Sequence, residues 1–501
     1  MFFSVISSSI VGVDALPVMV EADVCSGLPS FSIVGYVSTQ VREAQDRVRT
    51  AIKNLGVSLP PQRITINLSP GDLRKDGTRF DLPIAVAVLA ALGRISAEKL
   101  HNVMVIGELH LDGRVQAVTG ILPSVLLAKD MGCRSCIVPL ENQREAELVE
   151  GIRIIGIESL WTLMAYCRGE EIPLADEPML SEEDAYEVDF SDMYGQETVK
   201  RAAMIAAAGF HNLLLTGPPG SGKSMTARRL PTILPSLTRE EELEISKIYS
   251  IAGLLSHEKP LRKTRPFRAP HHSITTAALC GGGKNPKPGE VTLSHRGVLF
   301  LDEFPEMKRD TLEMLRQPLE DRKIVISRAG GTYQFPSMFV LVAAMNPCPC
   351  GYFPDRNKCN CSFQEIRAYQ GRISKAMLDR IDLRCEIKAV SYLELEGNAL
   401  RGSSSAEMRE RVEEAAILQK ERYKNCSIKY NSELTSAMIK KYCLISKEGK
   451  ALLKEAFEKF GLSARGYHRL IKVARTIADL EGDEIITELH ISEALCFKCG
   501  D

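Results

Sequence analysis

Hydrophobic residues in the first third of the chain follow two spacings, one typical of strands and one typical of helices. Three short apolar segments fit buried strands: FSIVGY (31–36), RITINLS (63–69) and SCIVPL (135–140). Apolar residues recur with helical spacing in VREAQDRVRTAIKNLG (41–56), and LPIAVAVLAALG (82–93) is apolar nearly throughout, so both are predicted helices. We therefore expect residues 1–168 to form one domain of mixed strands and helices.

The hydrophobic pattern changes after a short acidic segment. Residues 169–190 contain two prolines and show no apolar period, so they are predicted to be a linker. Residues 191–390 alternate helical segments with short apolar runs, which are typical of the buried strands of a parallel sheet. Residues 391–501 are helical by pattern, with charged faces. The chain is thus predicted to be an α/β multidomain protein in which a C-terminal helical domain follows an α/β core.

A glycine-rich loop follows the first apolar run of this core. Leu213–Leu214–Leu215 leads directly into GPPGSGKS (217–224), which matches the phosphate loop G-x-x-x-x-G-K-[ST] between a predicted strand and a predicted helix. Glycines let backbone N–H groups turn toward phosphates, and the helix N-terminus adds positive potential. Lys223 can reach the β- and γ-phosphates, and Ser224 can place its hydroxyl on Mg²⁺. The residues expected to hold ATP are Gly217, Pro218, Pro219, Gly220, Ser221, Gly222, Lys223 and Ser224.

Two later apolar runs also end in polar side chains. GVLFLDEFPEM (297–307) delivers Asp302 and Glu303, and FVLVAAMN (339–346) delivers Asn346. Adjacent carboxylates after a buried strand can supply a Mg²⁺ ligand, here Asp302, and a group that polarises the attacking water, here Glu303. Asn346 can hydrogen-bond that water or the γ-phosphate. The sequence therefore predicts an ATP-hydrolysing site.

Composition narrows the remaining choices. The apolar content of 45% and charged content of 25% are ordinary for a globular protein, and the net charge of −1 gives no bulk field that would attract nucleic acid or a membrane. No apolar run reaches the roughly 18 residues of a membrane span, and acidic residues interrupt the apolar N-terminus, so we expect neither a membrane segment nor a signal peptide. Fourteen cysteines in such a chain favour reduced thiols or a metal site, and hence a cytoplasmic location.

Four of those cysteines follow Asn346 closely. CPCGYFPDRNKCNC (348–361) holds two C-x-C pairs separated by a short polar loop. Four thiolates at such spacing can form a tetrahedral Zn²⁺ site, which would staple a loop too small to build its own core. The alternative is a set of reduced structural cysteines. The candidate zinc ligands are Cys348, Cys350, Cys359 and Cys361.

Several motifs together resemble those of one family. The YifB/ComM group of magnesium-chelatase-like AAA+ ATPases has motifs similar to FRAPHHS (267–273), GGGKNPKPGE (281–290), GVLFLDEF, LEDRKIVISRAGGT (319–332), AAMNPCPCG (343–351) and SARGYHRLIKVARTIADL (463–480). The resemblance covers essentially the whole chain. It implies an AAA+ core in which Asn346 is sensor 1 and Gly195–Gln196 lies at the adenine side, followed by a helical lid. It also implies a ring-forming hexamer, and the competence-associated members are DNA branch-migration helicases.

The same resemblance suggests a role for arginines outside the phosphate loop. In this clade an arginine finger precedes the fourth strand of the core and acts on the nucleotide of a neighbouring subunit, which matches Arg380, with Arg372 as the runner-up. The alternative for Arg380 is a structural salt bridge to Asp379 or Asp382.

The resemblance further places a sensor 2 arginine in the lid and two loops at the ring pore. Arg465 is the candidate for sensor 2, and Arg469 is its substitute. The pore loops correspond to the insertion around GGGKNPKPGE and to the hairpin KIVISRAGGTYQF (323–335). The candidate DNA contacts on them, each of which has a solvated surface charge as its alternative, are Lys284, Lys287, Lys323 and Arg328.

The N-terminal domain of this group is similar in fold to the Lon-protease domain (ribosomal protein S5 domain 2-like). The position of Lon's catalytic serine is matched by Arg79 in DGTRFD (76–81), and that of its lysine falls in TGILPS (119–124), which offers Leu122 and Ser124. Because a Ser–Lys dyad needs an activating base beside its nucleophile, a non-proteolytic scaffold is expected. Two functions stay open: a hexameric motor on DNA, and a chelatase-like remodelling ATPase that acts on a protein partner.

Overall fold

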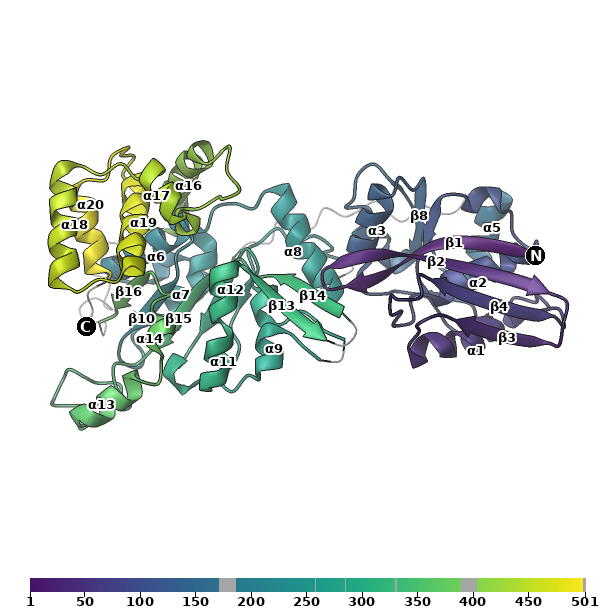
Figure 1. The fold of residues 1–501 in the computed structure, drawn as a ribbon, viewed down its shortest axis with the longest axis horizontal. Helices are drawn as coiled ribbons and strands as arrows, with labels where there is room; N and C mark the ends of the chain where they lie inside the picture. Colours follow the sequence, from purple (N-terminus) through teal and green to yellow (C-terminus); the bar gives the residue numbers. More distant parts are fainter. Residues whose placement is uncertain (171–185, 257, 284, 329–330, 389–402, 499–501) are drawn as a thin grey trace. The chain divides into compact units, whose positions relative to one another are not determined.

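The computed structural model describes residues 1–170, 186–256, 258–283, 285–328, 331–388 and 403–498 (Figure 1). Most of the predicted linker and the candidate pore residue Lys284 lie outside these ranges. The chain divides into two compact units. Unit 1 comprises Met1–Glu183, Glu242–Arg262 and Val325–Gln334, and unit 2 comprises Asp184–Glu241, Lys263–Ile324 and Phe335–Asp501.

Unit 1 is built on a seven-stranded mixed sheet with the strand order β3-β4-β2-β1-β5-β8-β9. β1 and β2 form an antiparallel hairpin, β2 also pairs antiparallel with β4, and the other neighbours are parallel. The strands are β1 (Phe2–Val11), β2 (Asp14–Cys25), β3 (Ser30–Val34), β4 (Arg63–Ser69), β5 (Val103–Val105), β8 (Ser135–Pro139) and β9 (Arg153–Ile157), with a separate small pair of β6 (Glu108–Leu109) and β7 (Val115–Gln116). The predicted strands at 31–36, 63–69 and 135–140 are confirmed within one or two residues.

The helices of unit 1 follow from local sequence. α1 (Thr39–Asn54) begins after Ser38, whose hydroxyl accepts a hydrogen bond from the N–H of Val41, and its apolar stripe is buried. α2 (Asp81–Ala91) is buried nearly all round, as its apolar sequence predicts. The remaining helical elements of this unit are α3 (Ile121–Asp130), α4 (Gln143–Ala146), α5 (Leu160–Arg168) and most of α8 (Arg239–Ala252).

Unit 2 contains a five-stranded parallel sheet with the order β11-β12-β15-β10-β16. Its strands are β11 (Phe267–Arg268), β12 (Val298–Leu301), β15 (Val340–Met345), β10 (Leu213–Thr216) and β16 (Leu383–Glu386). Every residue of β12 and β15 is buried, which explains why both read as continuous apolar runs. The parallel sheet predicted for the core is thereby confirmed.

Helices surround this sheet. The helices of the core are α6 (Glu197–Gly209), α7 (Lys223–Ile233), α9 (Thr276–Cys280), α10 (Glu290–Leu293), α11 (Arg309–Met314), α12 (Arg316–Asp321), α13 (Phe363–Gln370) and α14 (Lys375–Leu378). The C-terminal helices are α16 (Ser405–Arg422), α17 (Ser436–Tyr442), α18 (Lys447–Lys459), α19 (Ala464–Leu480) and α20 (Glu488–Cys496), drawn in green to yellow in Figure 1. The predicted hairpin at 323–335 is formed by β13 (Lys323–Arg328) and β14 (Gly331–Pro336).

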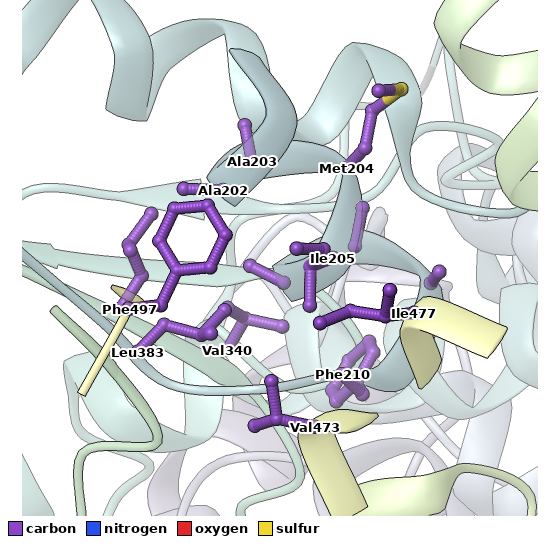
Figure 2. Packing of buried hydrophobic residues seen from close by; sticks show 14 of the residues in the cluster. Ala202, Ala203, Met204, Ile205, Phe210, Val340, Leu383, Val473, Ile477 and Phe497 are labelled. Atoms are coloured by element: carbon purple, nitrogen blue, oxygen red, sulfur yellow. The ribbon is translucent and has the colours of Figure 1, made fainter. Parts of the chain in front are cut away.

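One hydrophobic core joins the sheet of unit 2 to its C-terminal helices. α6 lies between them, because it contacts β16 on one side and α16 and α19 on the other. Figure 2 shows residues of all three parts in this one cluster: Ala202 and Ile205 of α6, Leu383 of β16, and Val473 and Ile477 of α19. The ring of Phe210, at the end of α6, stacks on Tyr430 with 4.6 Å between centroids. The described helices include none with both the length and the apolar character that crossing a bilayer requires.

Candidate active site

The candidate site lies at the carboxyl ends of three neighbouring strands of unit 2. In the order β12-β15-β10, each strand is followed by one predicted part of the site: Asp302 and Glu303, then Asn346, then the phosphate loop. Parallel strands all end at the same edge of a sheet, and ligands of open α/β sheets bind there. The sheet thus brings together residues that are far apart in the sequence.

The phosphate loop has the backbone geometry that its glycines predict. Gly220 and Gly222 adopt φ values of +74° and +94°, which side-chain-bearing residues rarely tolerate. An added Cβ at Gly217 would lie 2.5 Å from the carbonyl oxygen of Ile387, so that position has no space for a larger residue. Helix α7 begins at Lys223, so its first N–H groups point into the loop.

Lys223 is folded against its own loop. Its ammonium donates hydrogen bonds to the carbonyl oxygens of Gly217 at 2.6 Å and Pro218 at 2.9 Å, and to Oδ1 of Asn346 at 3.1 Å. Burial lowers the pKa of Lys223 from its ordinary value, and the Asp302 carboxylate opposes that shift. The cation is therefore held at the centre of the site by neutral oxygens, which the oxygens of a phosphate can replace.

Ser224 and Asp302 fit a magnesium ion. The Ser224 hydroxyl donates a 3.0 Å hydrogen bond to Oδ2 of Asp302, and the other carboxylate oxygen accepts from the N–H of Glu303 at 2.9 Å. Adjacent oxygen ligands of an octahedral Mg²⁺ lie about 3 Å apart, because each is about 2.1 Å from the ion. The pair therefore has the donor chemistry and the spacing that this ion requires.

Unsatisfied polar atoms also mark the loop as a binding site. In the part of the chain that the structure describes, Ser221 Oγ is buried without a hydrogen-bond partner, and so is Oε1 of Gln196. The Gln196 amide donates to the carbonyl oxygen of Ser221 at 3.0 Å and lies beside Gly222. Buried polar atoms are almost always satisfied in folded proteins, so these two fit contacts with a nucleotide. Gln196 thus contacts the phosphate loop, and its place at the adenine side stays a prediction of the resemblance.

Glu303 makes a contact that the sequence did not predict. Its Oε2 lies 2.7 Å from Nδ1 of His272, whose ring is 4.1 Å from that of His271. Both histidines belong to FRAPHHS (267–273), one of the motifs that carry the family resemblance. The pair of adjacent histidines was the sequence feature that could have pointed to His272, because it comes shortly after β11, the strand that pairs with β12.

The four predicted zinc ligands converge. Their sulfur atoms all lie within 4.8 Å of one another, with 3.3 Å between Cys348 and Cys350 and 3.7 Å between Cys348 and Cys359. Sulfur atoms bound to one tetrahedral Zn²⁺ are about 3.8 Å apart, because each Zn–S bond is about 2.3 Å. All four cysteines are free thiols. The cluster therefore fits zinc in both donor type and spacing.

The cysteine loop is in contact with the phosphate loop. Gly351 has a φ of +88°, and an added Cβ there would lie 2.6 Å from Cδ of Pro219. The side-chain amide of Gln370 donates to the carbonyl oxygen of Pro347 at 3.1 Å, which holds the chain between Asn346 and the first cysteine. The position of the cysteine cluster therefore affects the positions of both the phosphate loop and Asn346.

Arg380 and Arg465 converge on a carboxylate of α12. Arg380 lies 2.6 Å from Oε1 of Glu320 and also donates to the carbonyl oxygen of Ala376, whereas Arg465 lies 3.6 Å from the same Glu320 oxygen. Arg380 is 9% exposed and Arg465 73% exposed. The partner of Arg380 is therefore Glu320, not the Asp379 or Asp382 considered from the sequence, because α12 approaches Arg380 from elsewhere in the chain.

The two substitute arginines have partners of their own. Arg372 pairs with Glu306 at 2.6 Å. Arg469 pairs with Asp379 at 3.1 Å and donates to the carbonyl oxygen of Ile381 at 2.9 Å, so it links α19 to the segment before β16. Of the candidate DNA contacts, the described ones are exposed: Lys287, Lys323 and Arg328.

The two positions matched to Lon's dyad lie together in unit 1. Arg79 donates a 2.7 Å hydrogen bond to Oγ of Ser124, whose hydroxyl donates to the carbonyl oxygen of Gly120. Both side chains are buried, and burial lowers the pKa of Arg79 to about 10. The positions matched to Lon's dyad from the sequence thus carry a guanidinium and a hydroxyl.

Comparisons with known proteins agree with this arrangement. The matching families are "Magnesium chelatase, subunit ChlI" at residues 189–395, "Subunit ChlI of Mg-chelatase" at residues 20–142 and "Magnesium chelatase, subunit ChlI C-terminal" at residues 402–498. The chain is 42% identical to the competence protein ComM of Haemophilus influenzae, over 99% of this chain and 97% of that protein. It is also 42% identical to the protein YifB of Escherichia coli, over 98% of this chain and 96% of YifB.

A more distant relative is the magnesium-chelatase 38 kDa subunit of Acidiphilium rubrum, which is 25% identical over 60% of this chain and 87% of the subunit. The match to ComM and YifB extends through both units, whereas the chelatase subunit matches a smaller part. This chain therefore belongs to the YifB/ComM family of magnesium-chelatase-like proteins.

Proposed function

We propose that this chain is an ATP-hydrolysing AAA+ motor that assembles into a hexameric ring and acts on DNA. The observation that carries the proposal is the convergence of the phosphate loop, Asp302, Glu303 and Asn346 at one edge of a parallel sheet. Phosphoryl transfer needs positioning and charge stabilisation more than covalent chemistry, and these residues supply both. Membership of the magnesium-chelatase-like family supports the ATPase assignment.

Each residue has a role in this scheme. The loop N–H groups and Lys223 bind the β- and γ-phosphates, and Ser224 with Asp302 holds the magnesium ion. When bound, that ion neutralises charge that develops on the phosphate oxygens. Glu303 polarises the attacking water, and Asn346 orients that water against the γ-phosphate.

The arginine cluster supports a site shared between subunits. Arg380 and Arg465 share Glu320, so a single carboxylate holds two cations that phosphoryl transfer can use. We assign Arg380 as the finger and Arg465 as sensor 2, both released from Glu320 when a neighbouring nucleotide binds. Arg372 stays the runner-up for the finger, and Arg469 is the weaker choice for sensor 2 because three partners already hold it.

We also assign zinc to the cysteine cluster. Four thiols within 4.8 Å of one another are the donor set of a structural zinc site. The ion would hold a loop with few apolar residues in contact with Pro219 and beside Asn346. A cytoplasmic location, where thiols stay reduced and ATP is abundant, fits this chemistry.

DNA is the proposed substrate because of both family and charge. A relative that matches almost the whole chain carries the name competence protein, and the family resemblance implies that the competence-associated members act on DNA. The exposed cations Lys287, Lys323 and Arg328 would each be repeated six times in a hexamer. Such a ring offers local positive charge even at a net charge of −1. In this scheme the N-terminal domain is a non-proteolytic scaffold with a Lon-like fold, since Arg79 and Ser124 cannot act as a nucleophile and base.

The second candidate is a remodelling ATPase that acts on a protein partner. The 25% identity to a magnesium-chelatase subunit favours it. The ATPase rate of the full-length protein, measured alone and with single-stranded, duplex and forked DNA, separates the two functions. Stimulation by forked DNA supports the DNA motor. An ATPase indifferent to all three DNAs supports the remodelling function, and absence of ATP hydrolysis overturns both.

A further inference from the structure

Arg380, the proposed finger, lies at the edge of the sheet opposite to its own phosphate loop. It belongs to LDRID (378–382), the segment that leads into the amino end of β16, and β16 pairs in parallel with β10. The phosphate loop begins at the other, carboxyl end of β10. Because a strand rises about 3.3 Å per residue, the four residues of β10 separate the two edges by about 13 Å. The geometry thus favours a target of Arg380 outside its own nucleotide site.

The buried side chain of Asn212 fixes the backbone at Arg380. Asn212 directly precedes β10. Its Nδ2 donates to the carbonyl oxygen of Arg380 at 2.9 Å, and its Oδ1 accepts from the N–H of Leu341 in β15 at 3.0 Å. The main chain of Asn212 also pairs with Asp382, because its N–H donates to Oδ2 at 3.0 Å and its carbonyl oxygen accepts from the Asp382 N–H at 3.1 Å. This one residue therefore ties the segment of Arg380 to two strands of the sheet.

Arg469 of α19 holds the same segment from the C-terminal helices. Its guanidinium donates to the carbonyl oxygens of Ile381 at 2.9 Å and Leu378 at 3.4 Å, and to Oδ1 of Asp379 at 3.1 Å. These partners lie on both sides of Arg380 in the sequence. Because a guanidinium is a rigid planar fork of five N–H donors, one side chain can hold three acceptors in a fixed geometry. The contacts give Arg469 a structural role that needs no nucleotide.

The side chain of Arg380 is held differently from its backbone. Its ion pair with Glu320 involves a carboxylate that is 45% exposed, and partly exposed ion pairs contribute little stability. In the part of the chain that the structure describes, Nε of Arg380 is buried without a hydrogen-bond partner. The guanidinium can therefore exchange Glu320 for a phosphate while the buried contacts of Asn212 keep the backbone in place.

We propose that Asn212 and Arg469 are positioning residues that hold LDRID in place, so that Arg380 reaches the nucleotide of the neighbouring subunit. They fix the backbone on either side of Arg380 and leave its side chain able to leave Glu320. This inference rests on the proposed function, because it requires hydrolysis at a site shared between subunits. It deepens that function by naming the residues that build the shared site.

The test begins with steady-state ATP hydrolysis by the full-length protein. Asn212→Ala should assemble and bind ATP with a KM within a few-fold of wild type. Its kcat should fall on the order of 100-fold, the loss that a misplacement of about 1 Å gives. The matched control is Asn142→Ala, which removes another buried asparagine, whose Oδ1 accepts from the N–H of Val118 in unit 1. This control should keep the wild-type kcat.

Mixed rings distinguish a displaced finger from a damaged phosphate loop, which is the alternative because Asn212 directly precedes β10. Mixing Asn212→Ala with Lys223→Ala joins an intact loop to an intact finger at some interfaces, so part of the activity should return. Mixing Asn212→Ala with Arg380→Ala should give no recovery, since neither variant supplies a correctly placed finger. The reverse pattern would show that Asn212 supports its own phosphate loop and would overturn the inference. Recovery in both mixtures or in neither, or a wild-type kcat for Asn212→Ala, also overturns it.

Two further measurements separate this inference from the function on which it rests. Wild type that hydrolyses no ATP, or a mixture of Arg380→Ala with Lys223→Ala that recovers no activity, overturns the proposed shared site. When both succeed, a failed prediction for Asn212 counts against the positioning role alone. Binding of fluorescent ADP and light scattering verify folding and assembly. If Asn212→Ala fails these checks, Arg469→Lys takes its place with the same expected pattern, because lysine keeps the charge but lacks the planar fork.

Discussion

Asn346 accepts a 3.1 Å hydrogen bond from the ammonium of Lys223, which joins the end of β15 to the first residue of α7, the helix that follows the phosphate loop. Both side chains are assigned roles at the γ-phosphate. Bound ATP therefore has to separate them or place its phosphate between them. Asn346→Ala should leave ATP affinity within a few-fold of wild type. It should lower kcat by about 100-fold, the usual loss when one transition-state hydrogen-bond donor is removed. Single-turnover hydrolysis measured beside equilibrium nucleotide binding checks this; a loss of affinity alone would contradict the assignment.

Substitutions of Lys223 and Glu303 should impair different steps, ATP binding and ATP hydrolysis respectively. Lys223→Ala removes the cation that binds the phosphates, so ATP affinity should fall. Glu303→Gln should bind ATP as wild type does but lose turnover by about 100-fold or more, because the amide cannot polarise the water. Nucleotide binding and phosphate release, measured on both variants, distinguish the two outcomes. Near wild-type hydrolysis by Glu303→Gln would show that another group activates the water.

The cysteine cluster should contain metal. Elemental analysis of purified protein should give about one zinc per chain, and this zinc should be lost from the Cys348→Ser, Cys359→Ser double variant. Chelation should also weaken ADP binding, because Gly351 lies against Pro219 of the phosphate loop. The control is Cys133→Ser with Cys136→Ser, a buried pair whose thiol pKa values are raised by burial, and it should keep its zinc. Metal-free wild type would leave the four cysteines as reduced structural thiols.

The candidate pore cations should contribute to DNA affinity through phosphate contacts. Replacing Lys284, Lys287, Lys323 and Arg328 together by alanine should weaken binding to all DNA sequences alike and flatten its dependence on salt. Basal ATPase should survive. A matched control removes four exposed lysines of α18: Lys447, Lys450, Lys454 and Lys459. DNA titrations at several salt concentrations check the prediction, and equal effects of the two sets would locate DNA elsewhere.

Arg380 should act on a neighbouring subunit. Arg380→Ala should keep ATP binding and lose most hydrolysis, and Lys223→Ala should also be inactive. Mixed rings of the two variants would contain interfaces that join an intact phosphate loop to an intact arginine, so part of the activity should return. Light scattering verifies that the mixture assembles. No recovery in assembled mixtures would mean that Arg380 works within its own chain, and the same pairing with Arg372→Ala tests the runner-up.

Polar residues that follow a strand were predictable from the sequence. A buried parallel strand is a continuous apolar run, and the position at which that run ends can be read directly from the sequence. Asp302 and Asn346 were found in this way, Ser224 was found from the phosphate-loop motif, and the sheet brings the three together as expected. The cysteine cluster was also predictable, since all four ligands lie within one short segment. In both cases, the spacing of residues along the chain was enough to predict the site.

Contacts that depend on strand order or on distant helices were not predictable. The pairing of His272 with Glu303 requires that β11 border β12, and β11 is a two-residue strand without a hydrophobic pattern of its own. Arg380 meets Glu320, which lies 60 residues away, because α12 is adjacent to it in space. The assignment of Glu242–Arg262 to unit 1 likewise follows from tertiary packing that no local pattern records.

The single hydrophobic core of the described part of unit 2 has a consequence for how the proposed motor would transmit force. Ile205 of α6 shares one packed interior with Leu383 of the sheet and with Val473 and Ile477 of α19. Close-packed interiors resist internal sliding, so the described C-terminal helices must travel with the sheet as one stiff body. In the proposed hexamer, work done at the nucleotide would then reach the outer faces of those helices, and a stroke would be expressed between subunits and not inside one.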